Sequence, residues 1–154
     1  MINCIRTSSE NIDFIILVKE LDAELKIKDG EEHSFYSQSN KIDTIKYAIV
    51  AYDNDTPTGC GAIKEYSTDT IEIKRMFVPM DKRSKGIASI ILSELEFWAQ
   101  ELGYTKCILE TGKKQPEAIR LYTKNGYNSI PNYGQYEGVE NSVCFEKEID
   151  TKPS

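Results

Sequence analysis

A predicted strand leads through a basic turn into a predicted helix at Val78-Pro79-Met80-Asp81-Lys82-Arg83-Ser84-Lys85-Gly86-Ile87-Ala88. The first turn of a helix presents backbone N–H groups that have no partner and carries roughly half a positive charge, so it attracts anions. Gly86 would let a ligand approach the backbone closely, and Arg83 and Lys85 would add full positive charges. The turn is therefore a candidate site for a pyrophosphate group, and a solvated structural turn is the alternative that these residues leave open.

The helix after this turn is the clearest periodic segment of the chain. From Gly86 to Leu102, apolar residues recur every three or four positions, which is the pattern of one helical face, and Gly103 can end the helix. A short apolar strand follows at Lys106 to Thr111. A second helix is predicted at Pro116 to Asn125, with proline near its start and Gly126 just past its end. A strand, a crossover helix and another strand indicate a parallel or splayed pair of strands.

The remaining predicted elements are strands, apart from one helix near the amino terminus. The polar segment 31–43 is expected to form a loop or an irregular helix, and a loop is expected at 131–141. The predicted elements are a strand at 2–6, a helix at 11–28, a hairpin at 46–52 and 58–66, a strand at 70–78, and closing strands at 127–130 and 142–149. The hairpin and the strand at 70–78 together give three antiparallel strands before the basic turn.

Length and charge narrow the class of protein. The chain has 154 residues, which is enough for one domain, and we expect that domain at 1–150 with a short tail at 151–154. Its net charge of −6 would repel a phosphate backbone, so nucleic acid is not an expected partner. No apolar run approaches the length that crosses a bilayer, so no membrane association is expected.

The amino terminus and the cysteines favour a cytoplasmic protein. Residues Met1 to Arg6 lack the basic region and apolar core of an export signal. The four cysteines are widely scattered, and three lie inside apolar runs, so reduced and buried thiols are expected rather than disulfides or a zinc site. We expect no metal. The cysteines are Cys4, Cys60, Cys107 and Cys144.

A second segment supports a functional role for the basic turn. Its residues lie on the next helix and at the next strand boundary, and they are Ala118, Leu121, Tyr122, Gly126 and Tyr127. Together with the turn and the order of elements, this set strongly resembles the GNAT superfamily of acyl-CoA N-acyltransferases. The resemblance extends from the first strand to the last, and its specific motifs lie between about Glu72 and Tyr127. It implies an α/β (α+β) fold: a mixed, largely antiparallel sheet of about seven strands with a splayed central pair, flanked by about four helices.

The same resemblance implies that acetyl-CoA is the co-substrate. The basic turn would wrap the pyrophosphate, the backbone of Phe77 and Val78 would pair with the pantetheine arm, and strands holding Met76 and Thr111 would splay to admit the thioester. Two positions depart from the common pattern: Gln115 replaces a frequent Asn, and Ala88 replaces a frequent Gly. The implied cofactor-binding residues are Met76, Phe77, Val78, Arg83, Ser84, Lys85, Gly86, Ile87, Ala88, Gln115, Ala118, Leu121, Tyr122 and Lys124.

The predicted reaction is transfer of an acetyl group to the primary amine of a small molecule, by direct attack in a ternary complex. Aliphatic amines have a pKa of about 10, so a base must help to expose the lone pair. Glu72 is the first candidate, since several family members place a carboxylate at this distance before the basic turn; Glu110 and Glu65 are alternatives, and a solvated charge is the structural explanation of Glu72. Tyr122 matches the phenol that donates a proton to the departing thiolate in the family.

Two aromatic loops would border the acceptor site, through Phe35 and Tyr36 in one and Tyr133 and Tyr136 in the other. The acidic composition favours a cationic amine such as an amino acid, a polyamine or an aminoglycoside-like compound. A protein or peptide acceptor, a catalytically silent CoA-binding regulatory module and a homodimeric assembly also stay open. A nucleotide-binding domain is disfavoured, because the glycine-rich fingerprints of such domains are absent.

Overall fold

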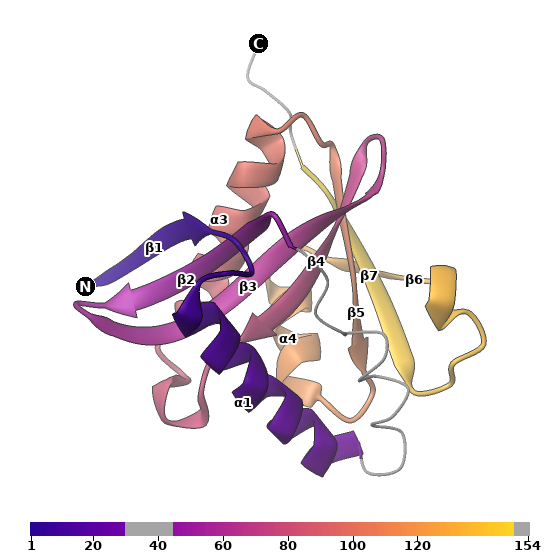
Figure 1. The fold of residues 1–154 in the computed structure, drawn as a ribbon. Helices are drawn as coiled ribbons and strands as arrows, with labels where there is room; N and C mark the ends of the chain where they lie inside the picture. Colours follow the sequence, from indigo (N-terminus) through magenta and orange to yellow (C-terminus); the bar gives the residue numbers. More distant parts are fainter. Residues whose placement is uncertain (30–44, 150–154) are drawn as a thin grey trace.

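A seven-stranded mixed sheet with the strand order β1-β2-β3-β4-β5-β7-β6 organises the chain (Figure 1). The computed structural model describes residues 1–29 and 45–149. The elements in chain order are β1 (Ile2–Thr7), α1 (Ile12–Asp29), β2 (Tyr47–Asp53), β3 (Thr56–Ser67), β4 (Thr70–Phe77), the 3-10 turn η2 (Met80–Lys82), α3 (Ile87–Glu101), β5 (Lys106–Gly112), α4 (Pro116–Lys124), β6 (Asn128–Ile130), the 3-10 turn η3 (Gly134–Tyr136) and β7 (Ser142–Glu148).

The topology confirms the predicted fold class. Strands β1 to β4 pair antiparallel in chain order, β4 and β5 are parallel, and β7 pairs antiparallel with both β5 and β6. The ends of the predicted elements lie within a residue or two of the observed ones. The described residues hold three α-helices where about four were expected, and the segment 31–43 lies outside the described residues.

Helices cover both faces of the sheet (Figure 1). Helix α1 packs on β2, β3 and β4 from one face, and α3 packs on β1 to β4 from the other. The position of β2, between two cores, explains why its sequence is almost continuously apolar. Ala48 and Val50 belong to the core under α1, whereas Ile49 and Ala51 belong to the core under α3. A strand covered on both faces has no solvent side and therefore loses the alternation of polar and apolar residues.

A β-bulge bends β4 in the middle of the sheet. Lys74 opposes Ala62 of β3 and Phe77 opposes Cys60, so β4 has one more residue than β3 over this stretch. Arg75 lies inside the bulge with a φ angle of +61°. A bulge bends its strand and re-aims the side chains that follow it. After the bulge, Phe77 packs in the core under α1.

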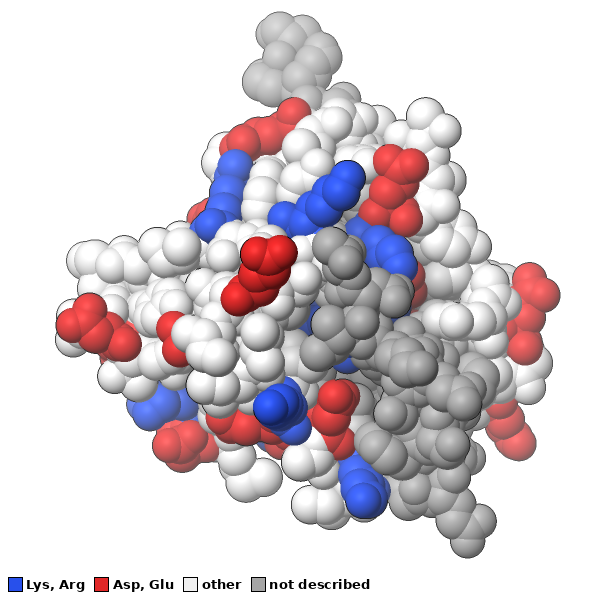
Figure 2. All heavy atoms as spheres, viewed as in Figure 1, with Lys and Arg blue, Asp and Glu red and all other residues white. Residues whose placement is uncertain are grey.

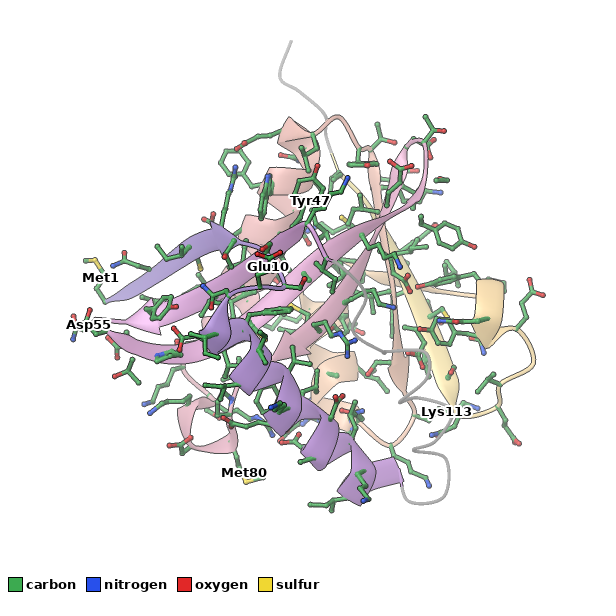
Figure 3. All side chains as sticks on the ribbon, viewed as in Figure 1. Met1, Glu10, Tyr47, Asp55, Met80 and Lys113 are labelled. Carbon is green, nitrogen blue, oxygen red and sulfur yellow. The ribbon has the colours of Figure 1, made fainter. Side chains whose placement is uncertain are left out.

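The bulged strand separates from β5. The two strands pair only where residues 70–72 of β4 meet residues 106–108 of β5, although both continue well beyond these positions. Figure 1 shows β4 and β5 diverging from that point. In Figure 3, Met80 just after β4 and Lys113 just after β5 lie well apart, at the ends of the two diverging strands. The predicted splayed central pair is therefore present.

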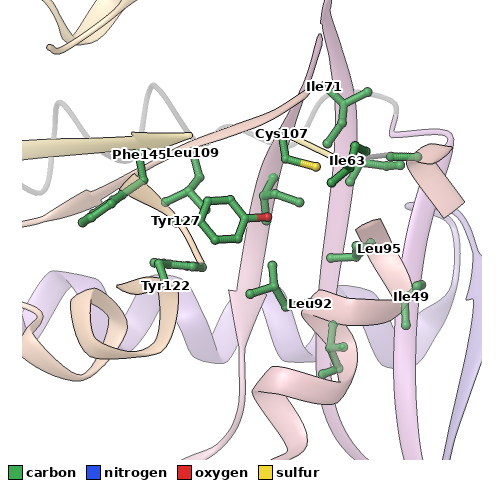
Figure 4. Packing of buried hydrophobic residues seen from close by; sticks show 14 of the residues in the cluster. Ile49, Ile63, Ile71, Leu92, Leu95, Cys107, Leu109, Tyr122, Tyr127 and Phe145 are labelled. Atoms are coloured by element: carbon green, nitrogen blue, oxygen red, sulfur yellow. The ribbon is translucent and has the colours of Figure 1, made fainter. Parts of the chain in front are cut away.

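Close packing holds α3 and α4 on the sheet. A Cβ at Gly61 of β3 would stand 2.7 Å from Sδ of Met76 and 2.8 Å from Cδ1 of Leu95, so only glycine fits without displacing them. The ring of Tyr122 on α4 meets the ring of Tyr127 edge to face, with centroids 5.8 Å apart (Figure 4). The centroid of the Tyr122 ring also lies 6.2 Å from that of Phe145, so α4 is packed against β7.

Candidate active site

The turn between β4 and α3 presents backbone N–H groups at a helix start. Ser84 and Gly86 have φ angles of 69° and 81°, and α3 begins at Ile87 without a capping hydrogen bond from a side chain. Among the described atoms, a Cβ at Gly86 would meet nothing within 4 Å, so the backbone is open on this side. The N–H groups of a first helical turn have no acceptor within the helix. The turn therefore has the form of an anion-binding helix start.

The Arg83 guanidinium in this turn is bound by groups of the protein itself. Its Nη2 donates hydrogen bonds to both carboxylate oxygens of Glu24 on α1, at 2.8 and 2.9 Å. Its Nε donates to the backbone oxygen of Val78 at 2.7 Å. The side chain thus fastens the turn to α1 and to the end of β4, and these contacts occupy much of the guanidinium that was predicted to bind pyrophosphate.

A pocket lies where β4 and β5 have separated. It receives side chains from α1, β4, β5, α4 and the turn η3. Six of the residues predicted for the site line it, namely Glu72, Met76, Gln115, Ala118, Tyr122 and Tyr136. The complete lining consists of Leu21, Leu25, Glu72, Ile73, Lys74, Arg75, Met76, Glu110, Thr111, Gly112, Gln115, Ala118, Tyr122 and Tyr136.

Glu72 stands in this pocket on the last residue of β4 that pairs with β5. Its side chain is 13% exposed, and its Oε2 accepts a 2.7 Å hydrogen bond from the hydroxyl of Tyr133. Burial raises the pKa of Tyr133, and the negative charge of Glu72 adds to the rise, so the phenol stays protonated and keeps donating. Tyr133, which is 61 residues further along the chain, therefore fixes the orientation of the Glu72 carboxylate.

Glu110 provides a second carboxylate in the same pocket. It lies on β5 and accepts a 2.8 Å hydrogen bond from the hydroxyl of Ser142 on β7. The two carboxylates thus come from the two strands that diverge, one from each side of the opening. Both are held by hydroxyl donors from the carboxyl-terminal part of the chain.

Tyr122 reaches the pocket from α4 and is buried among apolar side chains. Burial raises the pKa of its hydroxyl above the usual 10, and the negative charge of Glu110 raises it further. The phenol therefore stays protonated through neutral and mildly alkaline pH. A buried, protonated phenol at the edge of a pocket can donate a proton or a hydrogen bond.

Tyr136 lines the pocket, whereas Tyr133 stands behind Glu72. The two rings contact each other edge to face, with centroids 5.6 Å apart. Phe35 and Tyr36 lie outside the described residues. Glu65 is exposed and accepts a hydrogen bond from Tyr104, and it is not among the pocket residues, so the structure separates it from Glu72 and Glu110.

The other predicted cofactor-binding residues are not among those that line the pocket. Phe77, Val78 and Ile87 are buried, Ala88 and Leu121 are partly buried against the core, and Lys85 and Lys124 are exposed. The edge of β4 that faces β5 makes no pairing with that strand after Glu72. An extended chain could add to this edge through backbone hydrogen bonds.

Two cations of the pocket, Lys74 and Arg75, were missed as site residues. The alternation of Ile71, Glu72, Ile73 and Lys74 already placed Glu72 and Lys74 on one face of a strand, so the signal for Lys74 was in the sequence. Arg75 had no such signal, because a bulge is not visible as a break in the apolar pattern. Its side chain is buried under α1, with Asp22 at 3.9 Å.

All four cysteines are free thiols, of which Cys60, Cys107 and Cys144 are buried and Cys4 is partly buried. Burial raises the pKa of Cys60 and Cys107 to about 12, which leaves these thiols protonated and unreactive. Over residues 1–29 and 45–149, no three His, Cys, Asp or Glu side chains gather as metal ligands would. In the same part of the chain, no helix combines the length and apolarity of a membrane span. In Figure 2, acidic and basic side chains are interspersed over the visible face.

Comparison with known proteins supplies the context for this geometry. The family model described as acetyltransferase (GNAT) family matches residues 15–127. The uncharacterized N-acetyltransferase YsnE of Bacillus subtilis is 33% identical over 101 residues, which are 64% of this chain and 67% of that protein.

Solved structures agree with the sequence match. The crystal structure of a candidate acyl-CoA N-acyltransferase from Klebsiella pneumoniae superposes with a TM-score of 0.81 at 27% identity, over 96% of this chain and 97% of that one. A GNAT family acetyltransferase from Elizabethkingia anophelis with acetyl-CoA bound shares the fold, with a TM-score of 0.68 at 17% identity, over 96% and 98% of the two chains. The chain belongs to the acetyltransferase (GNAT) family, whose co-substrate is acetyl-CoA.

Proposed function

We propose that this chain transfers the acetyl group of acetyl-CoA to the primary amine of a small molecule, by direct attack in a ternary complex. The observation that carries the proposal is the pocket between the diverging ends of β4 and β5, with two carboxylates and the buried phenols of Tyr122 and Tyr136 on its walls. An acid–base pair on opposite sides of an opening suits a reaction that removes one proton and delivers another.

The residues around the pocket fit the shape and charge of acetyl-CoA. The open backbone at Gly86 and the uncapped start of α3 would hold the diphosphate, with Lys85 adding positive charge. The edge of β4 that does not pair with β5 would hold the pantetheine arm through backbone groups. These two contacts would direct the thioester into the pocket, toward Tyr122.

Glu72 is the base in this proposal. It accepts a proton from the amine as the new C–N bond forms, and Tyr133 keeps its carboxylate oriented. Tyr122 donates its proton to the sulfur as the C–S bond breaks, so free CoA leaves as a thiol and the phenolate is reprotonated from solvent. Backbone N–H groups beside the bulge, near Phe77 and Val78, stabilise the charge that develops on the carbonyl oxygen.

The test is a panel of small amines incubated with acetyl-CoA and the protein, in which free CoA is measured and the acetylated product is identified by mass spectrometry. Turnover with an amine and formation of its N-acetyl product are expected. Calorimetry with acetyl-CoA, performed alongside, measures cofactor binding by itself. Acetyl-CoA binding without transfer to any amine would overturn the proposal and favour a silent CoA-binding module.

A further inference from the structure

The pocket walls carry positive as well as negative charge, and this bears on the acceptor that the proposed function requires. Lys74 and Arg75 line the pocket together with Glu72 and Glu110, and the buried Arg75 guanidinium has Asp22 of α1 at 3.9 Å. The chain as a whole is acidic, with a net charge of −6, and from this alone a cationic amine was expected, with amino acids, polyamines and aminoglycoside-like compounds all open. The pocket lining, in contrast, contains cations as well as carboxylates.

Lys74 is the cation that is placed to meet a ligand. Its side chain is 11% exposed, and its Nζ lies 3.9 Å from Oε1 of Glu72, which is longer than a hydrogen bond. Burial lowers the pKa of this ammonium group, because little water solvates its charge. An anionic group of a ligand would supply the close hydrogen-bonding partner that Glu72 does not provide.

The spacing of the two charges fits a compact zwitterion. Glu72 and Lys74 are two residues apart on one face of β4, so their Cα atoms are separated by about 7 Å. Their side chains converge to within 3.9 Å at the charged ends. An amine and a carboxylate joined through one or a few carbon atoms can therefore lie against both charges at once. The amine would face Glu72, and the carboxylate would face Lys74.

Polyamines and aminoglycosides fit this pocket less well. Such acceptors bring several positive charges, and a charge beyond the reacting amine would have to lie near the Lys74 ammonium group. Repulsion between like charges is strong where burial weakens solvent screening. A zwitterion brings one charge for Glu72 and one for Lys74, and it adds no net charge to the pocket.

We infer that the acceptor is an amino acid or a similar small molecule with a carboxylate close to its amine, and that Lys74 binds the carboxylate. This inference rests on the proposed acetyltransferase function and narrows its substrate. It makes Lys74 a specificity-determining residue, separate from the groups that move protons.

The test compares free amino acids with their carboxamides as acceptors. The two series share side chain and amine, and differ in the charge at the carboxyl position. Converting the carboxylate to an amide lowers the pKa of the neighbouring amine, so more of the amine is unprotonated at neutral pH. The intrinsic reactivity of the amine would therefore favour the amide series. If Lys74 donates a charged hydrogen bond to the carboxylate, wild-type kcat/KM should instead be at least about tenfold higher for the free acids.

Lys74→Met removes the charge and retains the aliphatic stem, and it should abolish this preference mainly by raising KM for the free acid. The KM for acetyl-CoA should not change, Lys74→Arg should restore part of the preference, and Lys19→Met, at an exposed position on α1, should leave it intact. Thermal melts establish that each variant is folded, and the wild-type comparison needs no variant.

Two results would overturn the inference, and they are distinguishable. If the wild type acetylates amides or polyamines as efficiently as free amino acids, the acceptor assignment is wrong and the acetyltransferase function stands. If no member of either series and no simple amine is acetylated, the proposed function fails and the inference fails with it.

Discussion

Arg83, in the turn before α3, donates from Nη2 to both carboxylate oxygens of Glu24 on α1, at 2.8 and 2.9 Å. The two residues are 59 positions apart in the chain, and both side chains are mostly buried, at 23% and 20% exposure. The guanidinium also donates to the backbone of Val78. One side chain thus connects α1, the end of β4 and the proposed pyrophosphate turn.

This connection predicts a loss of stability in Glu24→Gln. A hydrogen bond to a charged partner contributes about 1.5–3 kcal/mol, and the substitution weakens two of them, so the free energy of unfolding should fall by about that amount. Denaturant titration followed by circular dichroism measures the change. Glu20→Gln, at an exposed position on the same helix, is the matched control and should alter stability little. Equal stability of the two variants would argue against a structural role of the pair.

Glu72→Gln should lower kcat/KM by about a hundredfold or more near pH 7, because a positioned general base contributes about 10²–10⁴. The amide retains the shape of the side chain but cannot take the proton. Steady-state kinetics between pH 6 and 9 test this, with Glu148→Gln at an exposed position of β7 as control. Wild-type kinetics in Glu72→Gln across this range, with a large loss in Glu110→Gln, would move the base to β5.

Tyr122→Phe and Tyr127→Phe form a matched pair, since both phenols are buried and their rings touch. Tyr122→Phe should lower kcat by about a hundredfold or more with little change in stability. Tyr127→Phe removes a 2.8 Å hydrogen bond to Glu96, so it should reduce stability by about 1–3 kcal/mol and leave kcat nearly unchanged. Melting curves and steady-state kinetics separate the two outcomes, and full turnover in Tyr122→Phe would remove the proton donor from the mechanism.

The raised pKa of Tyr122 also predicts how kcat depends on pH above neutrality. The protonated phenol is the donor, and a pKa above the usual 10 keeps it protonated, so kcat should not fall between pH 8 and 10. A descending limb in this range that disappears in Tyr122→Phe would contradict the assignment.

Gly86→Ala and Gly103→Ala form a matched pair that tests the turn before α3, because each places a side chain on a residue with a positive φ angle. The two glycines have φ angles of 81° and 97°, and among the described atoms neither added Cβ would meet anything within 4 Å. Each substitution should reduce stability by about 1–2 kcal/mol, because a Cβ disfavours the left-handed region. Only Gly86→Ala should also weaken acetyl-CoA binding, which calorimetry measures. Equal binding by both variants would exclude the start of α3 as the diphosphate site.

Local sequence patterns were sufficient for the elements and their order. The apolar spacing from Gly86 to Leu102, the turn residues at 53–57 and the Pro116 and Gly126 boundaries each act over a few residues, so they could be read without the fold. The motif residues also placed Tyr122 and Glu72 near one another through the family resemblance. The pocket contains both.

The charge of the pocket was decided only by the tertiary structure. The bulge at Arg75 arises from the register between β3 and β4, and the opening arises because β5 stops pairing after Ile108, so both depend on strands distant in sequence. The same is true of Tyr133 on Glu72 and Glu24 on Arg83, at separations of 61 and 59 residues. Local patterns record which residues face a core, whereas the partners of a charged side chain are fixed by how the whole chain packs. The acidic composition therefore favoured a cationic acceptor, whereas the folded pocket places Lys74 beside Glu72.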